Sequence, residues 1–227
     1  MITVHHLNHS RSQRVLWLLE ELGLKYQVKR YERDAKSMLA PPELKAVHPL
    51  GKSPVITDGG ATVAESGAIV EYLLDTHGTR DGTPQLRPAP GTPQRLRFTY
   101  WLHYAEGSAM TPLLLALVFG RVGTAPMPFL VKPVARAIAA GAMKSLVQPQ
   151  IDLHLDYMQA ELALSPWFAG SEFSAADIQM SFPLEAARAR GGLDARRPHL
   201  MAFLDAVQAR PGYQRALAAG GPYDLLH

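Results

Sequence analysis

The first third of the chain alternates between short β-rich runs and a helix-like stripe of apolar residues. Residues 2–6 form a short β-rich run. Apolar residues then recur at positions 15, 16, 18, 19 and 22, a spacing that predicts a helix over residues 11–22, and Gly23 is suited to end it. Residues 26–31 alternate between apolar and polar side chains, as a half-buried strand does.

A β-hairpin and another helix follow this first unit. Two prolines at 41 and 42 predict the first turn of a short helix. Residues 54–57 and 61–64 are hydrophobic runs joined by Asp-Gly-Gly, which predicts a hairpin because glycine takes the positive φ of a tight turn at low cost. A helix over residues 65–77 is expected next. The order β-α-β-α-β-β-α predicts a thioredoxin-like unit, in which a helical crossover makes the first strand pair parallel and the tight turn makes the last pair antiparallel.

The remainder of the chain has no strand pattern. Residues 78–93 hold four prolines and three glycines, a composition typical of a linker. The long apolar-periodic segments after it predict an all-helical bundle. We therefore expect a thioredoxin-like α/β domain over residues 1–78, a linker over 79–92 and an all-α domain over 93–227. Prolines at 126, 128, 133 and 149 predict short or kinked helices between residues 123 and 149.

The amino-acid composition limits the partners and the chemistry that this protein can have. The 227 residues are 47% hydrophobic and carry a net charge of +3 without a run of basic residues, so nucleic acid is not an expected partner. The absence of cysteine excludes disulfides and thiolate metal sites, and any thiol chemistry must use a thiol from outside. The nine histidines show no ligand spacing, so no metal is expected. We see no leader peptide and no apolar stretch of about 20 residues, which predicts a cytoplasmic protein without a membrane partner.

The start of the helix at residue 65 is the most informative position. Glu65 and Ser66 place a carboxylate, a hydroxyl and free backbone N–H groups together at one helix start. Backbone donors there can bind a carboxylate, and the acidic side chain can bind an ammonium group. This combination predicts a receptor for a small zwitterion.

Three separated motifs resemble the cytosolic glutathione transferases, and most of all their GTT-type branch from fungi and bacteria. They are LNHSRSQRVLWLLEELGLKY (residues 7–26), APPELKAVHPLGKSPV (40–55) and FSAADIQMSFPL (173–184). Together they span nearly the whole chain in the family's order. The resemblance implies a glutathione-binding thioredoxin-like domain, an all-helical second domain, glutathione as cosubstrate and a homodimer.

The resemblance also implies roles at the first helix. Ser10 matches the serine whose hydroxyl donates to the thiolate of glutathione, four residues before an arginine that matches Arg14. From the residues alone, Ser10 or Ser12 could instead be the N-cap of the helix. Ser12 and Asn8 stay as rivals for the thiolate contact.

The glutathione contacts implied by the resemblance lie between residues 52 and 66. Glu65 and Ser66 would bind the γ-glutamyl end, with Ser66 taking its carboxylate. Ser53 and Pro54 would present backbone to the cysteinyl unit across a cis bond, although only about 5% of X–Pro bonds are cis and the sequence alone favours trans. Lys52, which is otherwise an ordinary solvent-facing lysine, would reach the glycyl carboxylate.

Two further groups of residues could have a purely structural role. The resemblance implies that Tyr104 and Ser108 line the pocket for an apolar electrophile, although aromatic residues at helical spacing more often form core. Ser174 and Asp177 form Ser-x-x-Asp before an apolar run, which predicts a capping box with a role in folding and none in catalysis.

The function expected from these features is conjugation of glutathione to an apolar electrophile. Two alternatives use the same fold. One is a glutathione-dependent disulfide reductase or peroxidase, in which the thiolate attacks sulfur or oxygen. The other is a binding protein that carries hydrophobic ligands without turnover, because fold alone does not separate these functions.

Overall fold

The computed structural model describes residues 1–78, 85–221 and 223. Its first part has the predicted element order: β1 (Ile2–Leu7), α1 (Ser12–Glu21), β2 (Tyr26–Tyr31), α2 (Glu43–Val47), β3 (Val55–Asp58), β4 (Ala61–Ala64) and α3 (Ser66–His77). The four strands form one sheet in the order β2-β1-β3-β4. β1 pairs with β2 in parallel, and the β1–β3 and β3–β4 pairs are antiparallel. The thioredoxin-like prediction is confirmed.

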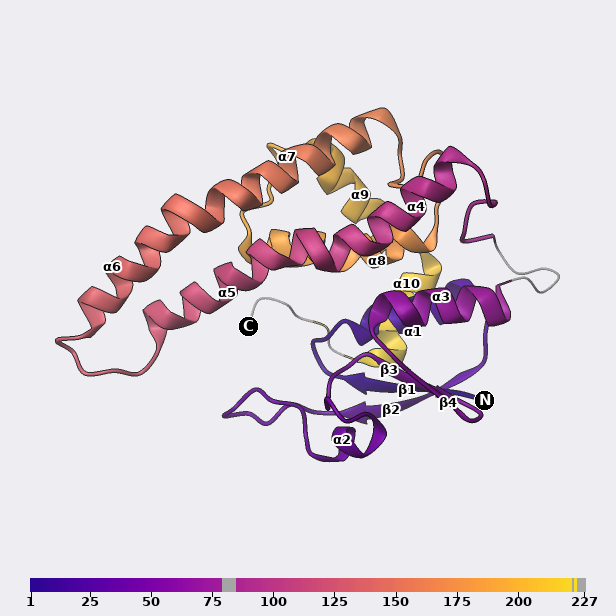
Figure 1. Ribbon diagram of the computed structural model, residues 1–227, viewed down its shortest axis with the longest axis horizontal. Coiled ribbons are helices and arrows are strands. Elements are labelled where there is room, and N and C mark those ends of the chain that lie inside the picture. The colour runs from indigo at the N-terminus through magenta and orange to yellow at the C-terminus, as the bar shows by residue number, and fades with distance from the viewer. Residues whose placement is uncertain (79–84, 222, 224–227) are drawn as a thin grey trace.

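Helices cover both faces of this sheet. In Figure 1, α1 and α3 lie on the face turned towards the rest of the molecule, and α2 lies on the opposite face. Every residue from Ser12 to Leu19 of α1 is buried, because this helix lies between the sheet and the helices of the second part. Its N-terminus is thereby fixed at the junction of the two parts.

The elements described after the linker are helices, as predicted, apart from an isolated β-bridge between Trp167 and Gly170. The helices are α4 (Pro93–Tyr104), α5 (Met110–Thr124), α6 (Lys132–Ala142), α7 (Gln148–Leu164), α8 (Ala175–Arg190), α9 (Pro198–Gln208) and α10 (Pro211–Gly220). α10 returns to pack against α1. The expected domain limits stay a prediction, and residues 79–84 of the expected linker lie outside the described residues.

Two π-helical turns, η1 (Ala105–Ala109) and η2 (Met143–Val147), join helices that run on without a break. Each turn closely precedes a proline, Pro112 in α5 and Pro149 in α7. A proline lacks the N–H that would bond four residues back, and a local π turn accommodates the loss. Between residues 123 and 149, α5 ends at Thr124 before Pro126 and Pro128, α6 has 11 residues, and the π turn η2 interrupts the helical run before Pro149, in agreement with the prediction of short or kinked helices.

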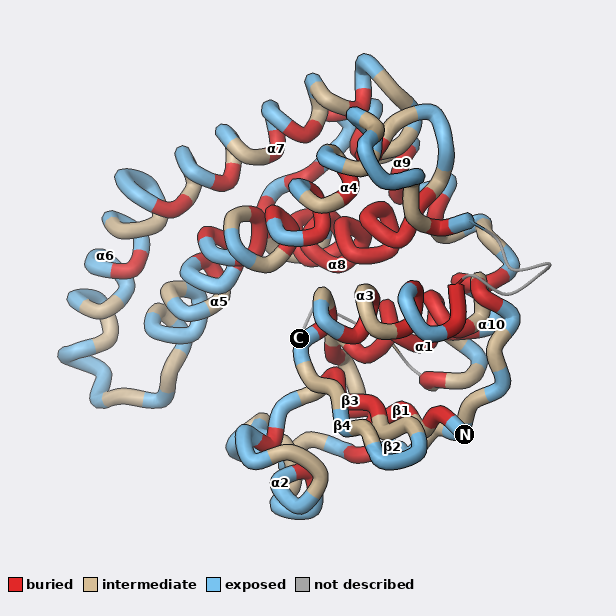
Figure 2. The backbone as a smooth tube through the Cα atoms, turned by 45° about the vertical axis from the view of Figure 1, so that its right-hand side comes forward, coloured by how far each residue is buried: buried red, intermediate tan, exposed pale blue. Residues whose placement is uncertain are grey.

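α8 is the centre of the second part. Its residues 175–187 are all buried, because α1, α3, α4, α5 and α9 pack against it, and Figure 2 shows α8 in red among the helices of this part. The predicted capping box is confirmed: Asp177 accepts from the backbone N–H of Ser174 at 2.8 Å, and both reciprocal bonds are present. Asp177 also accepts from the backbone N–H of Phe168 at 2.8 Å, so it holds the preceding loop as well.

One helical run in the described residues is long and apolar enough to cross a membrane by length and composition. It covers Pro93–Thr124, and 28% of its most apolar stretch is buried. This differs from the expectation that no such stretch exists. Core helices of soluble proteins meet the same criterion, so the finding by itself assigns no membrane role.

Candidate functional site

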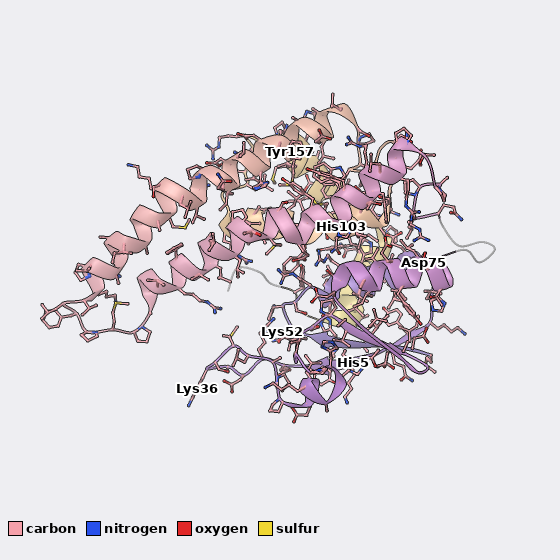
Figure 3. All side chains as sticks on the ribbon, in the orientation of Figure 1. His5, Lys36, Lys52, Asp75, His103 and Tyr157 are labelled. Atoms are coloured by element: carbon pink, nitrogen blue, oxygen red, sulfur yellow. The ribbon has the colours of Figure 1, made fainter. Side chains whose placement is uncertain are left out.

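A cavity of about 230 Å³ lies where the loop before β3, the start of α3 and the start of α1 meet. Five of the predicted binding residues line it: Lys52, Ser53, Pro54, Glu65 and Ser66. Figure 3 shows Lys52 on the side of the sheet that is turned towards the helical part. Elements far apart in the chain, including η1 through Glu106, therefore meet at one site.

The backbone of this site has two unusual features. The Ser53–Pro54 peptide bond is cis, as the family resemblance implies. Glu65 has φ 71 and ψ 123 at the N-terminal end of α3. A positive φ is uncommon for a residue other than glycine, and strained backbone of this kind concentrates at functional sites. The side chain of Glu65 is exposed and lines the cavity, and the fold holds its backbone in this uncommon conformation.

Ser66 is buried, and its hydroxyl oxygen already accepts two hydrogen bonds. Arg14 Nη2 donates to Ser66 Oγ at 3.1 Å, and Gln179 Nε2 donates to it at 3.0 Å. A hydroxyl has one hydrogen and two acceptor positions. With both acceptor positions occupied, the Ser66 hydrogen is left to donate to a group in the cavity, and a carboxylate is the strongest acceptor for it.

Arg14 is fixed by a buried ion pair. Its Nη2 lies 2.5 Å from Glu106 Oε1, and its Nη1 donates to the Gln179 carbonyl at 2.6 Å. Arg11 Nε lies 2.9 Å from both oxygens of Glu106. Burial raises the pKa of Glu106, but the charges of Arg14 and Arg11 outweigh it, so that the pKa is lowered and the carboxylate stays charged.

The sequence analysis found neither Glu106 nor Gln179 as part of this site. They reach it from η1 and α8, 92 and 113 residues from their partners Arg14 and Ser66. Gln179 stands in the quoted motif FSAADIQMSFPL, but neither residue differs in its local sequence from ordinary helical residues. His48 was also missed, although it stands in another quoted motif. It lines the cavity, and among the described residues its buried Nδ1 has no hydrogen-bond partner.

Ser10 is buried at the end of the loop before α1, beside Ser12 and Ser53. Its Oγ lies 2.8 Å from Ser12 Oγ and 3.5 Å from Ser53 Oγ, and it accepts from the Ser12 backbone N–H at 3.3 Å. Arg11 directly precedes α1 and makes no side-chain cap bond. Ser10 Oγ accepts from the Ser12 backbone N–H, as the hydroxyl of an N-cap serine does, so the alternative that Ser10 caps the helix stays open. Ser12 is the first residue of α1, and its hydroxyl bonds to His6. The structure therefore brings Ser10 next to Ser53, which lines the cavity.

A hydrogen-bond chain leads from Ser10 into the interior. Ser12 Oγ lies 2.9 Å from His6 Nδ1, and both residues are buried. Burial, with a smaller effect of the Arg30 charge, lowers the pKa of His6 to about 4, although a hydrogen bond to the Gly220 backbone opposes the shift. His6 is thus neutral near pH 7. Neutral His6 donates its single ring proton to the Gly220 backbone, so its Nδ1 accepts a hydrogen bond from the Ser12 hydroxyl. Ser12 Oγ can then accept a hydrogen bond from the Ser10 hydroxyl.

The two rivals of Ser10 make hydrogen bonds of their own. Asn8 Oδ1 accepts from the backbone N–H of Arg33, just after β2, at 3.0 Å. A thiolate would be bound by the Nδ2 hydrogens instead, so Asn8 remains a rival. Ser12 is fully buried and bonds inward to His6. Ser10 keeps a proton that can turn towards a ligand beside Ser53. Its role as thiolate contact stays a prediction.

Tyr104 and Ser108 lie on a different face of their helical run from Glu106. Tyr104 Oη is 2.5 Å from His154 Nδ1, and its ring packs at 5.8 Å from that of Tyr157. Tyr157 lies on α7, on the far side of α4 from the sheet (Figure 3). Ser108 lines a separate pocket of about 330 Å³ with His154. Neither residue lines the cavity that holds Ser66, and their role at an electrophile site stays a prediction.

Comparison with known families and proteins agrees with these features. Residues 1–75 match the family described as "Glutathione S-transferase, N-terminal domain", and residues 135–206 match "Glutathione S-transferase, C-terminal domain". The chain is 37% identical over 190 residues to glutathione S-transferase 3 of Schizosaccharomyces pombe, covering 83% of this chain and 75% of that protein. It is 36% identical over 194 residues to glutathione S-transferase 1 of Saccharomyces cerevisiae, covering 82% and 81%.

Solved structures are similar over nearly the whole chain. A glutathione S-transferase from Actinobacillus pleuropneumoniae superposes with a TM-score of 0.80 at 32% identity, covering 99% of this chain and 95% of that one. A sphingomonad glutathione S-transferase complexed with glutathione superposes with a TM-score of 0.70 at 25% identity, covering 96% and 98%. Both likenesses extend over the thioredoxin-like and the helical part.

Proposed function

This chain belongs to the glutathione S-transferase family, and from that premise we propose that it binds glutathione in the cavity at the start of α3, stabilises the thiolate and conjugates it to an apolar electrophile. The observation that carries the proposal is the hydroxyl of Ser66. Both of its acceptor positions are occupied by Arg14 and Gln179, which leaves its hydrogen for a ligand carboxylate. The homodimeric state and the cytoplasmic location stay predictions.

The cavity suits each part of glutathione. Ser66 and the free N–H groups at the start of α3 favour the γ-glutamyl carboxylate, and Glu65 favours the ammonium group beside it. The backbone around the cis Pro54 would pair with the cysteinyl unit. Lys52 and His48 also line the cavity, and the glycyl carboxylate would bind beside them.

We propose that Ser10 stabilises the thiolate in this arrangement. When glutathione loses its thiol proton to solvent, the Ser10 hydroxyl can turn from Ser12 Oγ to the sulfur while it still accepts from the Ser12 N–H. The sulfur then attacks the electrophilic carbon, a carbon–sulfur bond forms, and a leaving group departs with its electron pair. Lowering a thiol pKa by two units requires about 2.7 kcal/mol, which one charge-assisted hydrogen bond and a helix start can supply.

The experiment that tests the proposal measures binding and turnover separately. Calorimetry should show glutathione binding, and absorbance should show conjugation of an aryl halide such as 1-chloro-2,4-dinitrobenzene. The same protein is assayed with cumene hydroperoxide and with a glutathione mixed disulfide. Binding together with turnover of only the peroxide or the disulfide would favour the reductase or peroxidase alternative, and binding without any turnover would favour a ligand carrier.

A further inference from the structure

The turn between α5 and α6 exposes a group of large apolar side chains. Phe129 is 80% and Leu130 73% exposed, and Val131, Val134 and Ile138 are exposed as well. We call these five residues the hairpin tip. Figures 1 and 2 both show the turn at the far end of the α5–α6 hairpin, which projects from the rest of the molecule. Apolar side chains gathered on an exposed surface mark a site of interaction, whereas single ones are normal.

The spacing along α6 explains why its apolar side is bare. Val134 and Ile138 are four positions apart, so both lie on one side of the helix. Ala139 is buried, and it lines a pocket together with Arg136 and residues of α5. Arg136 Nε also donates to the Gly123 carbonyl of α5 at 3.4 Å. The helix α6 thus packs against α5 with one side and presents Val134 and Ile138 on the other.

The α5–α6 hairpin carries cations and no acid. Between Glu106 and Asp152 the sequence has no Asp or Glu, but it has four cations: Arg121, Lys132, Arg136 and Lys144. Arg121 lies in the last turn of α5, and Lys132 is the first residue of α6, directly after Val131. In residues 1–78, 85–221 and 223, no ion pair joins Arg121 or Lys132 to an acid. The two helix ends therefore place uncompensated positive charge beside exposed apolar side chains.

The backbone of the turn is suited to leave water. Pro126 and Pro128 have no N–H, and the N–H groups of Val131 and Lys132 both donate to the Pro128 carbonyl, at 3.0 and 3.2 Å. Unpaired backbone groups are costly in an apolar medium. Because these four positions leave no open N–H, the turn can enter the boundary between lipid headgroups and acyl chains at low cost.

We propose that the hairpin tip docks on a lipid bilayer that contains anionic lipids. Phe129 and Leu130 enter the boundary between headgroups and acyl chains, and Arg121 and Lys132 contact the anionic headgroups. This inference goes beyond the proposed function and does not rest on it. The docking is peripheral and reversible, without a membrane-spanning segment, and it differs from the sequence-based expectation of no membrane partner.

Two features favour a bilayer over a protein partner. The hairpin tip is the end of a narrow projection (Figure 1), whereas a stable protein complex buries about 800 Å² on each partner. A second copy of this chain would bring the same cations to the contact, because the commonest dimers use one surface patch of both subunits. Like charges would then repel each other, whereas anionic lipids attract them.

The test measures binding of the full-length protein to lipid vesicles by co-sedimentation. One set of vesicles is phosphatidylcholine alone, and the other is an equimolar mixture of phosphatidylcholine and phosphatidylserine. The protein should bind the mixed vesicles about tenfold more tightly, since each Lys or Arg near an anionic surface adds to the attraction. Added salt should reduce this preference, because it screens exposed charges.

Matched variants locate the contact. The double variant Phe129→Ser with Leu130→Ser should bind the mixed vesicles about tenfold more weakly, because it removes the apolar contact. Leu39→Ser, at a position that is 62% exposed in the thioredoxin-like part, is its control and should bind like wild type. Lys132→Gln should reduce the preference for phosphatidylserine, and Lys25→Gln, at an exposed position between α1 and β2, should not. Thermal unfolding shows that each variant is folded.

A fluorescent probe at the hairpin tip gives an independent measurement. In Phe129→Trp, mixed vesicles should shift the emission to the blue, and brominated lipid should quench it; Leu39→Trp should show neither effect. Binding that survives in the double variant, equal binding to both kinds of vesicle, or no binding at millimolar lipid would each overturn the inference. Self-association in sedimentation velocity that the double variant abolishes, without vesicle binding, would assign the hairpin tip to a contact between copies of this chain instead.

Discussion

Arg14 on α1 donates from Nη2 to the hydroxyl oxygen of Ser66 at the start of α3, at 3.1 Å. Both residues are buried, and Arg14 is held in turn by Glu106. The bond connects the two helices whose N-termini flank the proposed glutathione cavity. It also determines the direction of the Ser66 hydroxyl hydrogen, because the acceptor side of the oxygen faces the protein.

Ser66→Ala should weaken glutathione binding by about 1.5–3 kcal/mol, the range for a hydrogen bond to a charged group. The Arg14 and Gln179 donors lose their acceptor in this variant, so thermal unfolding should also show a lower stability. Calorimetry on the folded protein measures the affinity, and Ser171→Ala in an exposed loop is the control. Unchanged affinity in Ser66→Ala would remove Ser66 from the binding site.

The sequence predicted the elements of this site better than its contacts. Residues 2–77 follow local rules of spacing, turn chemistry and helix start, so the strands, the hairpin and the helices around Ser66 were correctly expected. The network behind Ser66 depends on Glu106 and Gln179, which reach it only after η1 and α8 have packed against α1. No local pattern specifies that packing.

The contacts of Tyr104 and Ser108 could not be predicted from local sequence either. The sequence correctly placed them on a helix after the linker, but the face that a helical residue presents depends on the neighbouring helices. The π turn η1 begins directly after Tyr104 and contains Ser108, and Glu106 of that turn contacts Arg14 of α1 while Tyr104 contacts His154 of α7. A sequence with regular helical spacing gives no sign of such a turn except the proline that follows it.

Asp177→Ala should destabilise the protein by about 2 kcal/mol and leave the affinity for glutathione unchanged in the folded fraction. The buried carboxylate accepts from the backbone N–H groups of Phe168 and Ser174, and unpaired buried donors are costly. Urea unfolding measures the loss. Asp194→Ala, at an exposed position, should stay within about 0.5 kcal/mol of wild type. Full stability with lost activity would give Asp177 a catalytic role instead of a structural one.

His6 should make the protein less stable in acid. Burial lowers its pKa from 6.5 to about 4 in the folded state, so between these values the unfolded chain binds the proton and the folded chain does not. Stability is therefore lost as the pH falls from about 6.5 to about 4, by up to about 3 kcal/mol for a shift of this size.

His6→Gln should flatten that part of the profile. Unfolding free energies from urea titrations at pH 7, 6, 5 and 4 measure the difference between variant and wild type. His199→Gln, at an exposed position, should keep the wild-type slope. A wild-type slope in His6→Gln would show that His6 is not the neutral, buried histidine that the bond from Ser12 requires.

Ser10→Ala should raise the pKa of bound glutathione by about one to two units while leaving its affinity near that of wild type. The expected size is that of one hydrogen bond to a charged group. The affinity should persist because the contacts at Ser66 and Pro54 do not involve Ser10. Ser12→Ala should have a smaller effect, since its backbone N–H still bonds to Ser10 Oγ, and Asn8→Ala the smallest, since Asn8 bonds to Arg33.

Ultraviolet titration of the thiolate in the complex, run on the three variants side by side, measures these shifts. A wild-type titration in Ser10→Ala together with a shift in Ser12→Ala or Asn8→Ala would move the thiolate contact to that residue. If none of the three shifts the titration, backbone N–H groups at the start of α1 alone stabilise the thiolate, and Ser10 only connects Ser12 to Ser53.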